Sequence, residues 1–184
     1  MAKKAPPQKD WLDLNETIDE VIAMTRNAVQ RNRVLLQIQL ANDLPRIKGD
    51  RVQLQQVILN LLINAIEAMS EEGEGPRQLW VSSETASETG GESEEKTLNG
   101  KALAEAEWTH LLVRVRDSGP GLDMKSFDRL FDAFYTTKSQ GLGMGLAISR
   151  SIIEAHGGRL WAQANAPRGA IFQFVLPIPE ERMS

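Results

Sequence analysis

Three stretches of the chain repeat apolar residues at the three- and four-residue spacing of a helix. They cover about 13–31, 50–69 and 145–155, and each predicts an amphipathic helix with one buried face. Asp13 and Asp50 stand where a helix N-cap is expected, each followed three residues later by Glu or Gln, as in a capping box. These three segments are therefore the predicted helices of the fold.

Alternating apolar and polar residues predict strands in the rest of the chain. In the clearest case, apolar residues occupy the even positions from Val34 to Leu40, with Gln37 and Gln39 between them. The last two predicted strands flank a turn at 165–169 and are expected to form a hairpin. The predicted strands cover 34–40, 46–48, 78–82, 109–116, 159–164 and 170–176, with a short helix over 127–134.

The composition is that of one globular domain without thiol chemistry. The chain has 184 residues, of which 41% are hydrophobic and 25% charged, and it contains no cysteine. A net charge of -4 argues against a nucleic-acid-binding surface, and no apolar run reaches the ~18 residues of a membrane span. Residues 1–12 are interpreted as a linker from a preceding segment, 83–107 as a flexible acidic insertion and 180–184 as a tail, which places the domain at 13–179.

Two asparagines one turn apart, Asn60 and Asn64, interrupt the apolar pattern of the second helix. Their amides could bond to neighbouring backbone or lie in solvent, or their oxygens could face a hard cation or a phosphate. Further along, Gly141, Gly143 and Gly145 alternate before a helix, where bare backbone N–H groups can approach an anion. Neither a Walker loop nor a dinucleotide fingerprint is present, so these glycines alone indicate no particular ligand.

Asp117 follows an apolar strand and precedes a tight Gly-Pro-Gly turn. Its carboxylate could simply cap that turn. Alternatively it could accept a hydrogen bond from an exocyclic amine such as N6 of adenine, and a partly buried carboxylate without a donor would make such a site selective.

Four short segments follow one another in a set order. They are Asn60-Leu-Leu-Ile-Asn64-Ala, Asp117-Ser-Gly-Pro-Gly, Phe131-Asp-Ala-Phe-Tyr-Thr-Thr-Lys138 and Gly141-Leu-Gly-Met-Gly-Leu-Ala. In this order the chain resembles, over roughly 13–177, the catalytic, ATP-binding domain of bacterial sensor histidine kinases. These kinases belong to a superfamily that also includes DNA gyrase and the mismatch-repair ATPases. The Thr-Thr-Lys sequence of the lid resembles that of the nitrogen- and oxygen-sensing subgroup of the kinases.

The resemblance implies a site for Mg-ATP. Asn64 would bind Mg²⁺ through its amide oxygen, and Asn60 would hold the same metal shell or a phosphate. Asp117 would recognise the adenine amine, and Lys138, on a mobile ATP lid, would reach the γ-phosphate. Asn60 and Lys138 are therefore the expected catalytic residues. The other expected nucleotide contacts are Gly119, Gly121, Leu122, Phe131, Phe134, Thr136, Thr137, Gly141, Leu142, Gly143, Met144, Gly145 and Leu146.

Two positions depart from the family pattern. Glu67 stands where many members carry lysine, so Lys138 is expected to supply that charge and Glu67 to be a solvated helix residue. Asn60 stands where ATP-hydrolysing relatives carry glutamate, and because an amide is a poor general base only slow hydrolysis is predicted. His110 and His156 are interpreted as structural, so the phosphoacceptor histidine is expected upstream of Met1.

The resemblance implies an α+β fold, a two-layer sandwich in which a mixed, mostly antiparallel sheet of about five strands carries helices on one face and an ATP lid. The expected function is transfer of the γ-phosphate to a histidine on a dimerisation domain of the same full-length protein, which then feeds a response regulator receiver domain. A cytoplasmic location is expected, with no nucleic acid and no membrane contact by this domain. Two alternatives stay open: an ATP-driven conformational clamp, and a nucleotide-binding or protein-docking module without catalysis.

Overall fold

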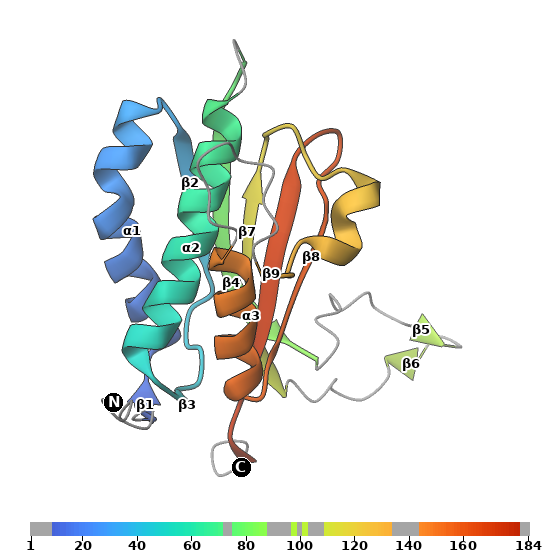
Figure 1. Cartoon of the computed structure of the whole chain (residues 1–184). Coiled ribbons are helices and arrows are strands. Elements are labelled where there is room, and N and C mark those ends of the chain that lie inside the picture. The colour runs from blue at the N-terminus through green and yellow to red at the C-terminus, as the bar shows by residue number, and fades with distance from the viewer. Residues whose placement is uncertain are drawn as a thin grey trace.

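A five-stranded sheet forms one layer of the computed structural model (Figure 1). The structure describes residues 9–71, 75–87, 97–98, 101–102, 109–133 and 144–180. The strands follow the order β2 (Leu35–Leu40), β4 (Gln78–Ala86), β7 (His110–Asp117), β9 (Ala170–Pro177) and β8 (Arg159–Ala164). β2 and β4 are parallel, and every other neighbouring pair is antiparallel. The prediction of a mixed, mostly antiparallel sheet is confirmed.

Three helices lie together on one face of this sheet (Figure 1). They are α1 (Leu14–Arg31), α2 (Arg51–Ser70) and α3 (Gly145–Ala155). The Asp13 carboxylate accepts a hydrogen bond from the Glu16 N–H at 3.2 Å, and the Asp50 carboxylate accepts one from the Gln53 N–H at 3.1 Å. Both N-caps were predicted, because capping depends on residues three positions apart.

Helix α2 is the central element of the core, since it packs against α1, α3 and β7. Among the described residues it is the one helix whose length and composition would allow it to cross a bilayer. The apolar side chains on its inner face instead fill the space between the helical layer and the sheet, and none of these is more than 2% exposed, whereas Val52 in the first turn is 72% exposed. The buried residues of α2 are Leu54, Val57, Ile58, Leu61, Leu62, Ala65, Ile66 and Met69.

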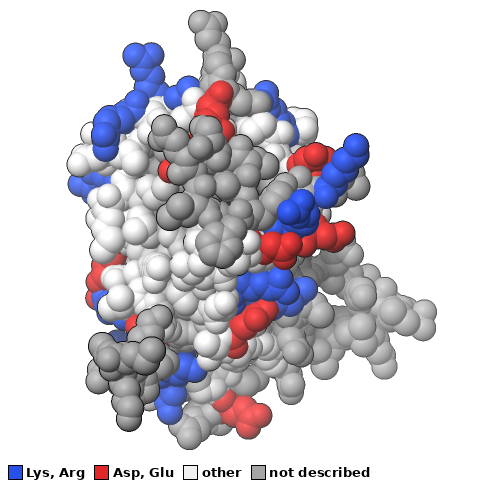
Figure 2. All heavy atoms as spheres, in the orientation of Figure 1, with Lys and Arg blue, Asp and Glu red and all other residues white. Residues whose placement is uncertain are grey.

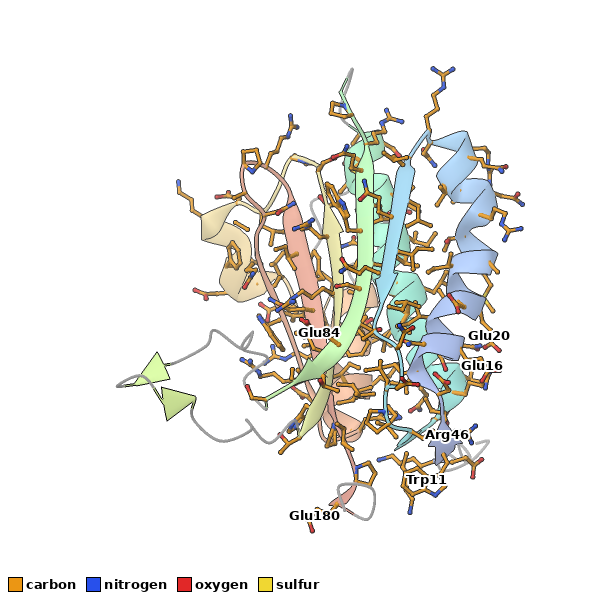
Figure 3. All side chains as sticks on the ribbon, turned by 180° about the vertical axis from the view of Figure 1, so that it is seen from behind. Trp11, Glu16, Glu20, Arg46, Glu84 and Glu180 are labelled. Carbon is orange, nitrogen blue, oxygen red and sulfur yellow. The ribbon has the colours of Figure 1, made fainter. Side chains whose placement is uncertain are left out.

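The opposite face of the sheet carries polar and aromatic cross-strand pairs (Figure 3). Arg114 of β7 forms an ion pair with Glu84 of β4, and its Nε donates to Gln173 Oε1 of β9 at 3.0 Å. The guanidinium of Arg116 lies 4.4 Å from the centre of the Trp80 ring. Most apolar side chains of the same strands point to the helices, and a second, smaller apolar cluster of Ala86, Leu112 and Val175 is buried apart from the main core.

Two segments that the sequence assigned to a linker and an insertion belong to strands. β1 (Asp10–Leu12) pairs with β3 (Ile47–Gly49), and its last residue is only 4% exposed. β4 continues through Ser83 to Ala86, and the Ser83 hydroxyl donates to Asn15 Oδ1 of α1 at 2.6 Å. The boundaries placed at 12 and 83 therefore exclude residues that are part of the fold.

The predicted short helix over 127–134 begins too late. A 3₁₀ helix, η1, spans Met124–Arg129, and the Asp123 carboxylate caps it by accepting from the Lys125 N–H at 3.1 Å. The aspartate at the turn thus fixes the start of this element, whereas the apolar pattern pointed to Phe127. The Phe134 end of the predicted helix lies outside the described residues.

Candidate nucleotide site

Asp117, the last residue of β7, is only 2% exposed. Its Oδ1 accepts hydrogen bonds from the Gly119 N–H at 2.8 Å and the Ala170 N–H at 3.3 Å. Burial raises the pKa of this carboxyl above its ordinary value, and the two backbone N–H groups only partly offset that rise. The charge is therefore costly to keep here, which favours a functional role over simple turn capping.

The second oxygen of Asp117 is left for another donor. Both hydrogen bonds fall on Oδ1, and no other described residue donates to Oδ2. Every fully buried side-chain nitrogen or oxygen among the described residues has a partner, so Oδ2, to which no described residue donates, is not completely enclosed. A buried carboxylate with one oxygen tied to backbone and one oxygen not completely enclosed is suited to accept a ligand N–H.

The two glycines after Asp117 have local structural reasons. A Cβ on Gly119 would lie 2.9 Å from Asp117 Oδ1, so a side chain there would displace the carboxylate. Gly121 has φ +86°, in the left-handed region, and a Cβ there would lie 3.1 Å from the Gly169 carbonyl oxygen. The glycines thus hold the carboxylate and the β8–β9 turn together, a role that the resemblance did not suggest.

Asn60 joins α2 to the first turns of α3. Its Nδ2 donates to Ser149 Oγ at 3.2 Å and to the Gly145 carbonyl oxygen at 3.3 Å. A backbone carbonyl can only accept, so the amide nitrogen must face α3 and Oδ1 must point away from it. The amide nitrogen is therefore bonded to neighbouring protein groups, one of the two alternatives that the sequence left open. The amide oxygen stays available to a cation or a donor.

The candidate residues Asn60 and Asn64 and the contact with the Asp117 loop are spaced along helix α2. Asn64, half-buried, stands one turn after Asn60. One turn further, the backbone of Ala68 packs against the Asp117–Gly119 loop, since a Cβ on Gly119 would lie 3.7 Å from the Ala68 carbonyl carbon. Eight residues of helix, about 12 Å, thus separate the α3 contact from the loop that holds Asp117. Asn60, Asn64 and the contact with the Asp117–Gly119 loop therefore follow one another along α2.

The N-terminus of α3 lacks the side-chain cap that α1 and α2 possess. Met144 occupies the N-cap position and makes no side-chain hydrogen bond to the helix, and Gly145 is exposed. The first-turn N–H groups are therefore not satisfied by a cap, and the helix dipole favours a negative charge at that end. An uncapped N-terminus of this kind fits the expected phosphate contacts of the segment whose last glycine is Gly145.

The remaining predicted contacts divide into two groups. Leu122, Phe131 and Leu146 are half-buried against the main core, and the Arg150 guanidinium lies 5.5 Å from the centre of the Phe131 ring. The predicted contacts that lie outside the described residues are Phe134, Thr136, Thr137, Lys138, Gly141, Leu142 and Gly143. The lid and its lysine therefore stay predictions.

The histidines have structural partners. His156 is 6% exposed, its Nε2 accepts from the Asp50 N–H at 3.0 Å, and its Nδ1 lies 2.7 Å from the Ile152 carbonyl oxygen. Because the Asp50 N–H can only donate, the ring proton lies on Nδ1, facing the Ile152 carbonyl oxygen. His110 lies within β7 with its Nδ1 2.7 Å from Thr109 Oγ1.

Charged groups around the site are mixed in sign. On the face shown in Figure 2, acidic and basic side chains lie side by side around η1 and α3, whereas much of the surface over α1 and α2 is uncharged. Glu67 is exposed on α2, as expected. Among the described residues no three His, Cys, Asp or Glu side chains gather as metal ligands. A bound metal would therefore depend on amide oxygens and on oxygens of the ligand itself.

A groove of about 760 Å³ lies on the other side of the Asp117 loop. Trp80 and Arg116 from the outer face of the sheet line it, together with Ser118, Gly119 and Arg168. Asn60, Asn64 and Asp117 do not line it. The groove therefore shares Gly119 with the expected nucleotide contacts but does not include these three residues.

A family model and curated relatives match most of the chain. The family model described as histidine kinase-, DNA gyrase B- and HSP90-like ATPase matches residues 49–180. The chain is 37% identical over 176 residues to the sensor histidine kinase TmoS of Ectopseudomonas mendocina, covering 96% of this chain and 16% of that protein. The chain spans less than a third of the length of the curated relatives it matches, with 16% and 31% as examples.

Solved structures share the fold across nearly the whole chain. The catalytic domain of the histidine kinase ThkA superposes with a TM-score of 0.74 at 31% identity, covering 95% of this chain and 99% of that one. A structure of ThkA in complex with the response regulator protein TrrA superposes with a TM-score of 0.70 at 28% identity, covering 95% of this chain and 43% of that one. The match to an isolated catalytic domain is thus nearly complete in both directions.

Proposed function

The chain belongs to the family of histidine kinase-, DNA gyrase B- and HSP90-like ATPases and corresponds to the ATP-binding catalytic domain of sensor histidine kinases, and on that basis we propose how it acts. It binds Mg-ATP and transfers the γ-phosphate to a histidine on a dimerisation domain of the same full-length protein. A response regulator receiver domain then takes the phosphate. The ThkA–TrrA complex supports this last partner by analogy.

The observation that carries the proposal is the buried Asp117 carboxylate, whose two hydrogen bonds from described residues both fall on Oδ1 and leave Oδ2 for a ligand. Adenine offers an amino group at the position where guanine has a carbonyl oxygen. An amine can donate to Oδ2, whereas a guanine carbonyl would place an acceptor against an acceptor in a buried site. The carboxylate therefore gives the site a preference for ATP over GTP, and its burial enlarges that preference.

The magnesium ligands are assigned to α2. Amide oxygens are suitable ligands for Mg²⁺, which usually binds few protein groups and completes its shell with water and phosphate oxygens. The orientation of Asn60 fits this, since its Oδ1 points away from α3. Asn64 is assigned the direct metal contact and Asn60 the same shell or a phosphate. When bound, Mg²⁺ would neutralise charge that develops on the transferred phosphoryl group.

The reaction is assigned as transfer to protein and not as hydrolysis. Asn60 presents an amide, which cannot take a proton from water at neutral pH. Lys138 is assigned to the γ-phosphate, where a positive charge stabilises the transition state. We place the domain in the cytoplasm, where ATP is available. Fast steady-state release of phosphate from the isolated domain would contradict the assignment to protein transfer.

The test is phosphotransfer in trans. The chain is incubated with γ-labelled ATP, Mg²⁺ and a purified histidine-bearing dimerisation domain of the full-length protein, and label on that domain is measured. The wild-type chain should label the acceptor, and Asn64→Ala should reduce labelling to background while leaving the melting temperature within a few degrees, since Asn64 is half-buried and not a core residue. An Asp19→Asn variant, exposed on α1, serves as a control and should label normally.

Labelling that is retained in Asn64→Ala would mean that the metal assignment is wrong. No labelling by the wild-type chain, together with measurable ATP binding, would favour a binding module without catalysis. Strong labelling of the 184-residue chain itself would contradict the structural interpretation of His110 and His156.

A further inference from the structure

The hydroxyl of Ser149 lies at the contact between α3 and α2. Ser149 is 0% exposed, and its Oγ accepts from Asn60 Nδ2 at 3.2 Å. We propose that Ser149 is a positioning residue, which holds the Asn60 amide so that Oδ1 is directed to the magnesium nucleotide. This deepens the proposed function and rests on it, because Asn60 has a ligand only if Mg-ATP binds beside α2.

The amide nitrogen of Asn60 is fully used by α3. It carries two hydrogens, and it has two acceptors four residues apart on one helix, the Gly145 carbonyl oxygen and Ser149 Oγ. Because the amide group is planar, two bonds on the nitrogen fix both the position and the plane of the oxygen. The direction of Oδ1 is thus set by α3 and not by α2, the helix that carries Asn60.

One of the two bonds alone would not fix that direction. The terminal torsion of an asparagine side chain is broad and has no sharp staggered minima. Without the hydroxyl, the amide keeps only the 3.3 Å bond to the Gly145 carbonyl, which is long for an N–H···O bond. The oxygen could then rotate about that bond, and a metal or phosphate contact would have to restrict this rotation when the nucleotide binds.

The location of Ser149 gives the contact a functional meaning. Ser149 stands one turn after Gly145, the last glycine of the segment assigned to the phosphates. The element that receives the phosphates and the residue assigned to the metal shell are therefore connected directly. An alanine at 149 would be close to serine in volume, so removal of the hydroxyl should affect Asn60 more than it affects packing.

The test separates magnesium-dependent from magnesium-independent binding by calorimetry. For Ser149→Ala we expect a Kd for Mg-ATP about 3- to 10-fold weaker, the ratio that corresponds to one neutral hydrogen bond. The Kd for ADP in the presence of EDTA should stay within about 2-fold of the wild-type value, since no metal contact is then at stake.

A matched control exists in the same domain. Ser83 is also a buried serine, 4% exposed, whose hydroxyl bonds to an asparagine side chain on another element, Asn15 Oδ1 of α1 at 2.6 Å. Ser83→Ala removes the same kind of buried Ser–Asn pair at a place away from the candidate site. It should lower stability without changing either Kd.

A double-mutant cycle with Asn60→Ala shows whether Ser149 acts through Asn60. In the Asn60→Ala background, adding Ser149→Ala should cause almost no further loss of Mg-ATP affinity. An unchanged Mg-ATP Kd in Ser149→Ala, an equal weakening with and without Mg²⁺, or full additivity in the cycle would each overturn the proposal. If Asn60→Ala itself leaves Mg-ATP binding intact, the role of Asn60 is wrong and the proposal falls with it. If the wild-type chain binds no ATP, the proposed function fails as well.

Discussion

Replacement of Asp117 by Asn should separate nucleotide binding from folding. The two side chains have nearly the same shape, so the amide oxygen can still accept from the Gly119 and Ala170 N–H groups. What changes is the second position, where an NH₂ group replaces Oδ2. A donor then faces the donating amine of adenine, and an attractive contact becomes a repulsive one.

The magnitude follows from the charge of the group that is lost. A hydrogen bond to a charged partner contributes about 1.5–3 kcal/mol, which corresponds to about a 10- to 150-fold weaker Kd for ATP. The free energy of unfolding of Asp117→Asn should be higher than that of the wild-type chain or equal to it. Burial raises the pKa of Asp117, so its ionised form destabilises the folded state at neutral pH, and a neutral amide removes that cost.

Calorimetric titration with ATP and GTP, combined with a thermal melt of the free chain at neutral pH, measures both quantities. Asp117→Asn should lose most of the preference for ATP and melt at or above the wild-type temperature. Asp13→Asn is the matched control, since it makes the same change in a carboxylate that accepts a backbone N–H at the start of α1. Wild-type ATP affinity in Asp117→Asn, or a loss that merely follows a lower melting temperature, would refute the reasoning.

Three further predictions test the parts around this carboxylate. Gly119→Ala should weaken ATP binding and lower stability by about 1–3 kcal/mol, because its Cβ would lie 2.9 Å from Asp117 Oδ1; unchanged ATP affinity in calorimetry would argue against the role of that loop. His156→Ala should lower the melting temperature by several degrees, since it leaves the Asp50 N–H without its acceptor, at a cost of about 1–3 kcal/mol; a wild-type melting curve would contradict this. The folded state holds the proton of Asp117 more tightly than the unfolded state does, because burial raises its pKa. As pH rises from the ordinary carboxyl pKa through this raised pKa, the unfolding free energy of the wild-type chain should therefore fall relative to that of Asp117→Asn. Equal pH slopes of the two proteins in denaturant titrations would exclude the effect.

Local signals explain which parts of the fold could be predicted. The starts of α1 and α2 follow from Asp13 and Asp50, and their buried faces from apolar spacing, because both depend on residues within one or two turns. The end of β4 could not be found in this way. Ser83 and Glu84 are polar and indicate a loop, but their partners are Asn15 of α1 and Arg114 of β7, which lie 68 and 30 residues away in the sequence.

The candidate site shows the same division. Asn60 and Asp117 could be selected from the sequence, because polar residues in apolar surroundings need an explanation. The contributions of Ser149 and Ala170 could not, since they depend on where α3 and β9 pack against α2 and β7. A serine on the inward face of a helix also has no sequence feature that distinguishes it from ordinary packing. The direction of the Asn60 amide is a property of the tertiary structure alone.

The most direct measurement is a crystal structure of the chain with Mg²⁺ and a non-hydrolysable ATP analogue. The account predicts the adenine amino group within hydrogen-bond distance of Asp117 Oδ2, an amide oxygen of Asn60 or Asn64 in the magnesium shell, and phosphates towards the N-terminus of α3. A nucleotide bound elsewhere, such as in the groove beside Trp80 and Arg116, with Asn60 and Asp117 untouched, would contradict it.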